Sequence, residues 1–388
     1  MINLRLKLEF ILEGLPWMAS TFSKPKYWLL VVLGASIGLE FYGRACGFNL
    51  TSDSIQYLSA AKSFHSDGIF IGSDGTYNPY WPPLFPVLLS FFENPLGALV
   101  WVNLVCKIFI GLMILFLAKT FLKNNFYRLV FLISSLVSVY MMMISVFVWT
   151  ELLFMALILL NVFFLLNVNN RNYFIGLIAT GFLLCIQRNA GLFWIGALSS
   201  WLLLNRENSI GLPKILLFFL VSTSGLWAWN IYNTWFIPAN FVFYDRPFFD
   251  GFMNNLLLMA GSFAKMFAPI SWVPLQFALA LVGAGFIAYN LRPISKNVFL
   301  FIVIIYALAF TILGKLDEYE IDRYLSVIVP FVCLLALMTL EKIAENAPKL
   351  LRVALVVICL FWLSYQGVRT AKNVRMWHDR SCLAETSL

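Results

Sequence analysis

The chain has 388 residues, of which 61% are hydrophobic and 12% are charged, and its formal net charge is +8. Soluble globular proteins are about 45–50% apolar and about 25% charged, so the composition excludes a water-soluble enzyme, a disordered protein and a disulfide-held secreted domain. The apolar segments are long and continuous rather than alternating, which excludes an outer-membrane barrel and predicts an all-α polytopic membrane protein.

The basic residues lie in short segments between apolar runs, so membrane topology explains the positive charge and nucleic-acid binding is not expected. With 2 histidines, the chain cannot build a multi-histidine metal site. The 6 cysteines show no Cys-x-x-Cys spacing, and we expect small core residues rather than metal ligands or a disulfide framework. They are Cys46, Cys106, Cys185, Cys333, Cys359 and Cys382.

The chain begins with a segment, 1–26, in which apolar residues alternate with charges such as Arg5 and Glu9. This pattern predicts an amphipathic helix on the cytoplasmic surface and not a cleavable signal. About eleven apolar segments then approach the roughly 20 residues that a membrane span needs. They are 27–45, 96–118, 129–147, 152–166, 173–186, 190–204, 215–236, 272–288, 298–314, 324–340 and 351–368.

Two pairs of these segments are separated by only a few polar residues, at 149–151 and at 187–189. Each pair is either two helices joined by a tight turn or one broken helix. We treat the whole chain, 1–388, as a single transmembrane domain with outer loops at 46–86 and 237–271 and a tail at 369–388. The second outer loop contains an apolar stretch, 256–267, which predicts a surface helix.

Most Lys and Arg residues of the loops fall on the side of the N-terminus, which the positive-inside rule assigns to the cytoplasm. The basic tail argues against this placement, because eleven spans would put it outside. Acidic residues gather in the outer loops, and acidic residues contribute little to topology. We therefore expect chemistry on the outer face. The expected location is a bacterial inner membrane with the active site toward the periplasm.

The first outer loop carries the most informative pattern. Residues 53–65 have helical spacing, and Ser52 or Asp53 could cap that helix. Asp53 is therefore either a capping residue or a functional carboxylate. The aromatic and proline-rich run 77–86 is either an interfacial aromatic belt or part of a site.

The order of motifs in this loop resembles the GT-C superfamily of polytopic glycosyltransferases, which use polyprenyl-phosphate sugars. The run DSIQYLSAAK, from Asp53 to Lys62, and the run WPPLFP, from Trp81 to Pro86, carry the resemblance. Protein O-mannosyltransferases and lipid A aminoarabinose transferases are the nearest families. The latter have a lysine directly before the two prolines, where this chain has Trp81.

Three later motifs resemble outer turns of the same superfamily and occur in the same order. They are WTELLF at 149–154, QRNAG at 187–191 and DRYL at 322–325 with Pro330. Together the motifs imply a GT-C-type bundle of about eleven helices, with surface helices in the first outer loop.

The resemblance implies inverting transfer of a sugar to an acceptor on the outer face. A carboxylate must remove a proton from the acceptor, and cations must hold the lipid phosphate. The candidates for catalysis are Asp53 as general base and Glu151, which could orient the acceptor or pair with an arginine. The candidates for phosphate or donor binding are Arg188, Arg323, Lys62 and Arg246, and Lys265 and Lys315 are further candidates for the same role. The candidates for acceptor contact are Tyr57, Tyr77, Tyr80 and Trp81.

Each charged candidate also has a structural interpretation. Glu151 could simply begin a helix, Arg188 could extend to the outer interface, and Arg323 could belong to a local ion-pair network. No cofactor is assigned, although the acidic group beside Arg323 could bind a divalent cation. That group consists of Asp317, Glu318, Glu320 and Asp322.

Two other function classes fit a polytopic chain of this kind. One is a lipid or polysaccharide transporter or flippase, which should show paired inverted halves and charges near the midplane. The other is an O-antigen-type ligase or polymerase, which needs no Asp after the first span. The expected partners are a polyprenyl-phosphate-linked sugar donor, a glycan, lipid or protein acceptor, and membrane lipids.

Overall fold

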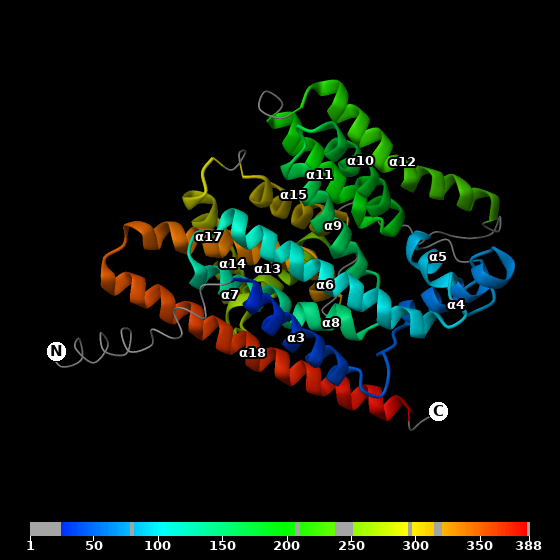
Figure 1. The fold of residues 1–388 in the computed structure, drawn as a ribbon, viewed down its shortest axis with the longest axis horizontal. Coiled ribbons are helices and arrows are strands. Elements are labelled where there is room, and N and C mark those ends of the chain that lie inside the picture. Colours follow the sequence, from blue (N-terminus) through cyan, green and yellow to red (C-terminus); the bar gives the residue numbers. More distant parts are fainter. Residues whose placement is uncertain are drawn as a thin grey trace.

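The computed structural model describes residues 25–77, 81–205, 210–236, 251–293, 297–313 and 320–385, and these residues form helices joined by turns (Figure 1). The expected amphipathic segment falls almost wholly outside them. The helices are α3 (Pro25–Gly43), α4 (Ser52–Asp67), α5 (Leu84–Ser90), α6 (Pro95–Phe121), α7 (Asn125–Leu136), α8 (Val139–Val146), α9 (Glu151–Leu166), α10 (Arg171–Gln187), α11 (Ala190–Leu204), α12 (Leu212–Phe236), α13 (Phe252–Phe267), α14 (Val273–Asn290), α15 (Val298–Leu313), α16 (Ile321–Ser326), α17 (Val329–Asn346) and α18 (Lys349–Glu385).

Nine of the eleven expected spans coincide with one helix each within the described residues, while residues 129–147 are divided between α7 and α8 and residues 324–340 between α16 and α17. Both ambiguous pairs are two helices, because the chain leaves helical geometry between α8 and α9 and again between α10 and α11. Among the residues that the structure describes, five helical segments are long and apolar enough to cross a membrane, by length and composition. They are Pro95–Phe121, Asn125–Val146, Leu212–Trp235, Val273–Asn290 and Lys349–Leu383.

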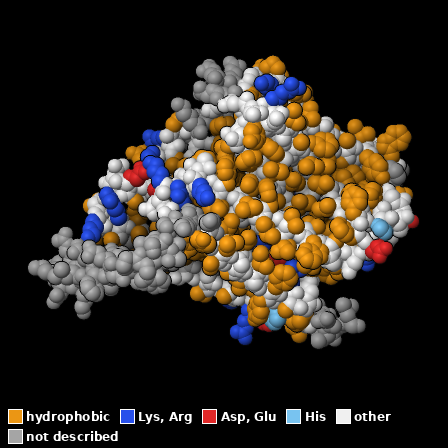
Figure 2. Space-filling model, in the orientation of Figure 1, with side chains coloured by type: hydrophobic (Ala, Val, Ile, Leu, Met, Phe, Trp, Pro, Cys, Tyr) orange, Lys and Arg blue, Asp and Glu red, His pale blue; other side chains and the backbone are white. Residues whose placement is uncertain are grey.

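The described helices expose many large hydrophobic side chains. Hydrophobic side chains cover most of the face in Figure 2, and Leu30, Trp101 and Phe361 are each about two-thirds exposed. In a bilayer such side chains face lipid, so close packing and polar contacts between helices hold the bundle together. One buried contact joins Lys107 of α6 to Glu40 of α3 at 2.7 Å, and Asn103 donates to the carbonyl of Ser145. Asn103 and Lys107 therefore make helix–helix contacts.

The helices α4 and α5 pack against each other at one end of the bundle, on the right in Figure 1. The long helix α18 runs beside α3, and its C-terminal end lies at the same end of the bundle as α4 and α5. This long helix continues without a break from the last expected span into the segment predicted as a tail, as far as Glu385.

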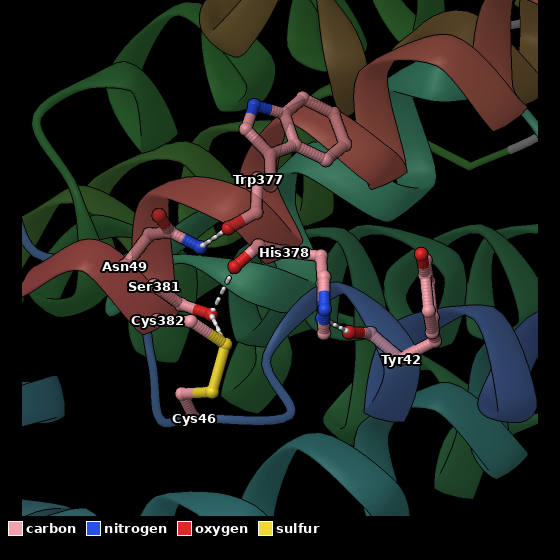
Figure 3. The surroundings of a disulfide bond; sticks show 7 residues. All are labelled: Tyr42, Cys46, Asn49, Trp377, His378, Ser381 and Cys382. Atoms are coloured by element: carbon pink, nitrogen blue, oxygen red, sulfur yellow. Dashed lines mark hydrogen bonds between the residues drawn. A yellow bond between two sulfur atoms is a disulfide. The ribbon is translucent and has the colours of Figure 1, made fainter. Parts of the chain in front are cut away.

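The expectation that all cysteines are small core residues is wrong for one pair. Cys46, just after α3, and Cys382, near the end of α18, form a disulfide across 336 residues of sequence (Figure 3). Two neighbours hold the same junction, since Asn49 donates to the carbonyl of Trp377 and the His378 ring stacks on Tyr42 with centroids 4.5 Å apart. The end of α18 therefore lies at the same end of the bundle as α4.

We predict that removing the disulfide, by replacing Cys46 and Cys382 with Ser, lowers the free energy of unfolding by about 2–4 kcal/mol. The physical reason is that the cross-link restricts the unfolded chain over a very long loop. Thiol titration under denaturing conditions checks the pairing. It should find Cys106, Cys185, Cys333 and Cys359 reactive before reduction, and Cys46 and Cys382 in addition after it. Equal thiol counts before and after reduction would contradict the pairing.

Candidate active site

The carboxylate of Asp53 is not used as a helix cap. The N-cap of α4 is Thr51, which forms a capping box with Ser54, and not Ser52 or Asp53 as the sequence suggested. The Ser54 hydroxyl also donates to the carbonyl of Val148 at 3.0 Å, which fixes the start of α4 on the turn before α9. Because the cap is satisfied elsewhere, the carboxylate of Asp53 in the first turn is left to face the bundle.

The partner of Asp53 is Arg323, 270 residues away on the short helix α16. The guanidinium donates from Nη1 to Oδ2 of Asp53 at 2.7 Å and from Nε to Oε1 of Glu151. Its centre lies over the ring of Trp149 at 4.6 Å from the ring centroid. Arg323 therefore bridges two carboxylates that come from different helices.

A second arginine meets the same glutamate from the other side. Arg188 lies in an extended conformation between α10 and α11, and its Nη1 contacts Oε1 of Glu151 and donates to Oγ1 of Thr150 at 2.6 Å. The turn is tight, because a Cβ at Gly191 would collide with the backbone at Leu184. Glu151 is 1% exposed and joins both guanidinium groups.

The surroundings of the site keep Arg323 charged and the Tyr57 hydroxyl protonated. Burial by itself lowers the pKa of Arg323, but the charges of Glu151 and Asp53 outweigh it, so the net pKa is raised and the guanidinium stays charged. Burial raises the pKa of the Tyr57 hydroxyl, which therefore stays protonated. Among these groups, Asp53 is the carboxylate that borders open space.

A cavity of about 580 Å³ opens beside this cluster. It combines two carboxylates, Asp53 and Glu320, with two cations that could bind an anion and an aromatic wall. Glu151 does not line it and lies behind the arginines. The lining residues are Asp53, Tyr57, Trp81, Pro82, Gln187, Arg188, Asn189, Ala190, Phe193, Phe310, Glu320, Arg323 and Tyr324.

The structure brings Asp53, Glu151, Arg188 and Arg323 together with the aromatic candidates Tyr57 and Trp81, whose ring centroids lie 5.6 Å apart.

Other candidates lie elsewhere. Lys62 is exposed on α4, and Lys265 is exposed on α13; neither lines the cavity. Tyr77 donates to Oδ1 of Asn233 on α12 at 2.6 Å, outside the cavity lining. The remaining candidates, Tyr80, Arg246 and Lys315, lie outside the described residues.

The suggested cation site finds no support in the described part of the chain, where no group of three or more His, Cys, Asp and Glu residues could hold a metal ion. Asp317 and Glu318 lie outside that part. Asp322 contacts Ser262 of α13 and Arg369 of α18 instead of joining Glu320 in a cluster.

Some residues of the site could not be selected from the sequence. Phe193 and Phe310 line the cavity, but nothing in the local pattern separates them from ordinary membrane-helix residues. Gln187 also lines the cavity and was not named as a candidate, although it begins the QRNAG motif at 187–191.

Comparison with known proteins shows the fold. No protein-family model matches the chain, and no curated protein matches it by sequence. Among solved structures, the chain is similar to ArnT from Cupriavidus metallidurans, solved in complex with undecaprenyl phosphate, with a TM-score of 0.64 and 11% identity. The match covers 92% of this chain and 78% of ArnT.

The chain has a GT-C-like fold. The expected all-α polytopic bundle with surface helices in its first outer loop is confirmed. At 11% identity the similarity concerns the fold and not a particular activity.

Proposed function

We propose that the protein is an integral-membrane glycosyltransferase that moves a sugar from a polyprenyl phosphate to an acceptor hydroxyl. The observation that carries the proposal is that Asp53 and two arginines, Arg188 and Arg323, line one cavity in a GT-C-like fold. ArnT, the similar structure, holds undecaprenyl phosphate. The same lipid class is the proposed carrier here.

The chemistry follows from the charges around the cavity. The acceptor oxygen attacks the anomeric carbon, and the bond from that carbon to the phosphate oxygen breaks. Asp53 takes the proton of the acceptor hydroxyl as general base. The phosphate leaves as an anion, and the guanidinium groups of Arg188 and Arg323 stabilise its charge. Attack from the face opposite the phosphate inverts the anomeric carbon.

The role proposed for Glu151 is to position these arginines rather than to contact substrate. It is buried, it does not line the cavity, and it forms ion pairs with both guanidinium groups. An arginine so anchored keeps further N–H donors for a ligand, because a guanidinium carries five. Glu151 also neutralises part of the positive charge while the site is empty.

The cavity is also suited to a lipid-linked substrate. Phe193 of α11 and Phe310 of α15 line it, and their ring centroids lie 5.2 Å apart in an edge-on contact. Trp81 and Tyr324 add further apolar surface near the charged groups. The cavity therefore combines charged groups with apolar surface. A polyprenyl phosphate likewise combines an anionic head with an apolar chain.

The disulfide supports an active site on the outer face. Disulfides persist in oxidising compartments and are rare in the cytosol. Cys46 precedes α4 and Asp53 by a few residues, so the site and the disulfide share one end of the bundle. We infer a bacterial inner membrane with this end toward the periplasm.

The proposal predicts that purified protein binds undecaprenyl phosphate and that Arg188→Gln or Arg323→Gln weakens binding about tenfold or more, because each removes a charge-assisted contact worth about 1.5–3 kcal/mol. Native mass spectrometry or a lipid-dependent shift in unfolding temperature measures the binding. Lys372→Gln, which removes an exposed charge from α18, is the control and should bind as the wild type does. Equal binding by all variants would contradict the phosphate assignment.

A further inference from the structure

The helix that carries Arg323 is too short to fix its own orientation. α16 has six residues, Ile321–Ser326, and its N-cap Glu320 makes no side-chain capping bond. Isolated helices of this length are not stable in water, so neighbouring elements must hold α16 in place. Arg323 contacts Asp53 and Glu151 on one side of α16. The other side needs an anchor as well.

Asp322 is that anchor. Adjacent residues of a helix point in directions about 100° apart, so Asp322 and Arg323 face different partners. The carboxylate of Asp322 accepts from the hydroxyl of Ser262 on α13 and from Nη2 of Arg369 on α18 at 3.1 Å. This polar contact therefore ties the helix that carries Arg323 to two further helices.

Arg369 is itself held in one place. Its Nη1 donates to the carbonyl of Lys265 at 2.9 Å and to the hydroxyl of Tyr140 at 3.2 Å, and its guanidinium lies over the Tyr140 ring. Tyr140 closes the network by donating to the carbonyl of Ser262 at 3.2 Å. A residue of the basic C-terminal segment thus contacts α8, α13 and α16 together.

Neighbouring side chains of α18 bind the end of α13 in the same way. Tyr365 donates to the carbonyl of Lys265 at 2.9 Å, and Trp362 donates to the carbonyl of Met266 at 2.9 Å. Carbonyls in the last turn of a helix have no partner within that helix. By satisfying them, α18 fixes α13 and with it Ser262, the second partner of Asp322.

From this network we infer that Arg369 is a positioning residue, which sets the orientation of Arg323 toward the substrate phosphate through Asp322. The identity of the ligand rests on the proposed function. The placement of α16 rests on the contacts of Asp322 and Arg369 alone. The network gives the C-terminal half of α18 a part in the active site, although none of its residues lines the cavity.

A double-mutant cycle tests the inference. We expect Arg369→Gln to weaken undecaprenyl phosphate binding about three- to tenfold, because Arg323 loses its fixed orientation. In protein that already carries Arg323→Gln, adding Arg369→Gln should change the lipid affinity by less than about twofold, because the effects of residues that act through one another do not add. Arg375→Gln, on the exposed side of the same helix, is the matched control.

Three results would overturn the inference. The first is that folded Arg369→Gln protein binds the lipid as tightly as the wild type does. The second is that the losses of affinity in the two single variants add in the double variant. The third is that the Arg375→Gln control loses as much affinity as Arg369→Gln. Should Arg369→Gln fail to fold, Ser262→Ala removes the other partner of Asp322 and should weaken binding in the same non-additive way.

A structure of the Arg369→Gln protein separates this inference from the proposed function. We expect α16 to be displaced and the contact between Arg323 and Asp53 to be lost, whatever the substrate. If the wild type does not bind undecaprenyl phosphate, the proposed function fails and the position of α16 still decides the inference. An unmoved α16 would overturn it.

Discussion

Replacing Asp53 with Asn should lower the rate of sugar transfer by about 10²–10⁴-fold, the range expected for loss of a general base. Asn keeps the size of the side chain but cannot take the proton of the acceptor hydroxyl. Undecaprenyl phosphate binding should stay close to that of the wild type, because the arginines that would hold the phosphate remain. Single-turnover transfer measured with saturating donor separates the chemical step from binding.

The control for this variant is Asp74→Asn, which removes an exposed carboxylate of the same outer loop that accepts hydrogen bonds from Thr76 in its turn. It should transfer sugar at the wild-type rate. Full activity of the Asp53→Asn protein would contradict the general-base role and favour a ligase-type mechanism that needs no such Asp.

Replacing Glu151 with Gln should destabilise the protein by about 3–5 kcal/mol, the range seen when one partner of a buried charge pair is removed. Glu151 joins Arg188 and Arg323 in a nearly solvent-free position, so the substitution leaves two buried cations without their shared counter-ion. Thermal unfolding in detergent measures the loss. Sugar transfer by the folded fraction should also fall, because neither arginine keeps its place.

An exposed pair provides the matched comparison for Glu151. Lys123 and Glu345 are joined at 2.7 Å, but their side chains are 81% and 45% exposed. Glu345→Gln should not change the unfolding temperature measurably, because solvent screens such a pair. Equal stability of the Glu151→Gln and Glu345→Gln proteins would contradict the buried role of Glu151.

The spans and their breaks could be predicted because hydropathy is a local property of the sequence. The polar residues at Trp149–Glu151 and Gln187–Asn189 marked the two turns, and the structure has separate helices on either side of each. The cap of α4 was placed one or two residues too late, because Thr51, Ser52 and Asp53 are all good capping residues. Their order alone does not choose among them.

The contacts that build the site could not be derived from local patterns. Arg323 meets Glu151 across 172 residues of sequence and Asp53 across 270. Burial of Glu151 behind the arginines, which changes its proposed role, depends on how α9, α10 and α16 pack. The disulfide and Arg369 were missed for the same reason, since Cys382 and Arg369 lie in the segment predicted as a tail and their partners are far away in the sequence.

The most direct test uses wild-type protein in vesicles with a panel of undecaprenyl-phosphate sugars and candidate acceptors on the side of the Cys46–Cys382 disulfide. We predict a new glycosidic bond of inverted configuration, with one undecaprenyl phosphate released for each sugar transferred. Movement of the sugar lipid across the bilayer without a new glycosidic bond would contradict the account and identify a transporter.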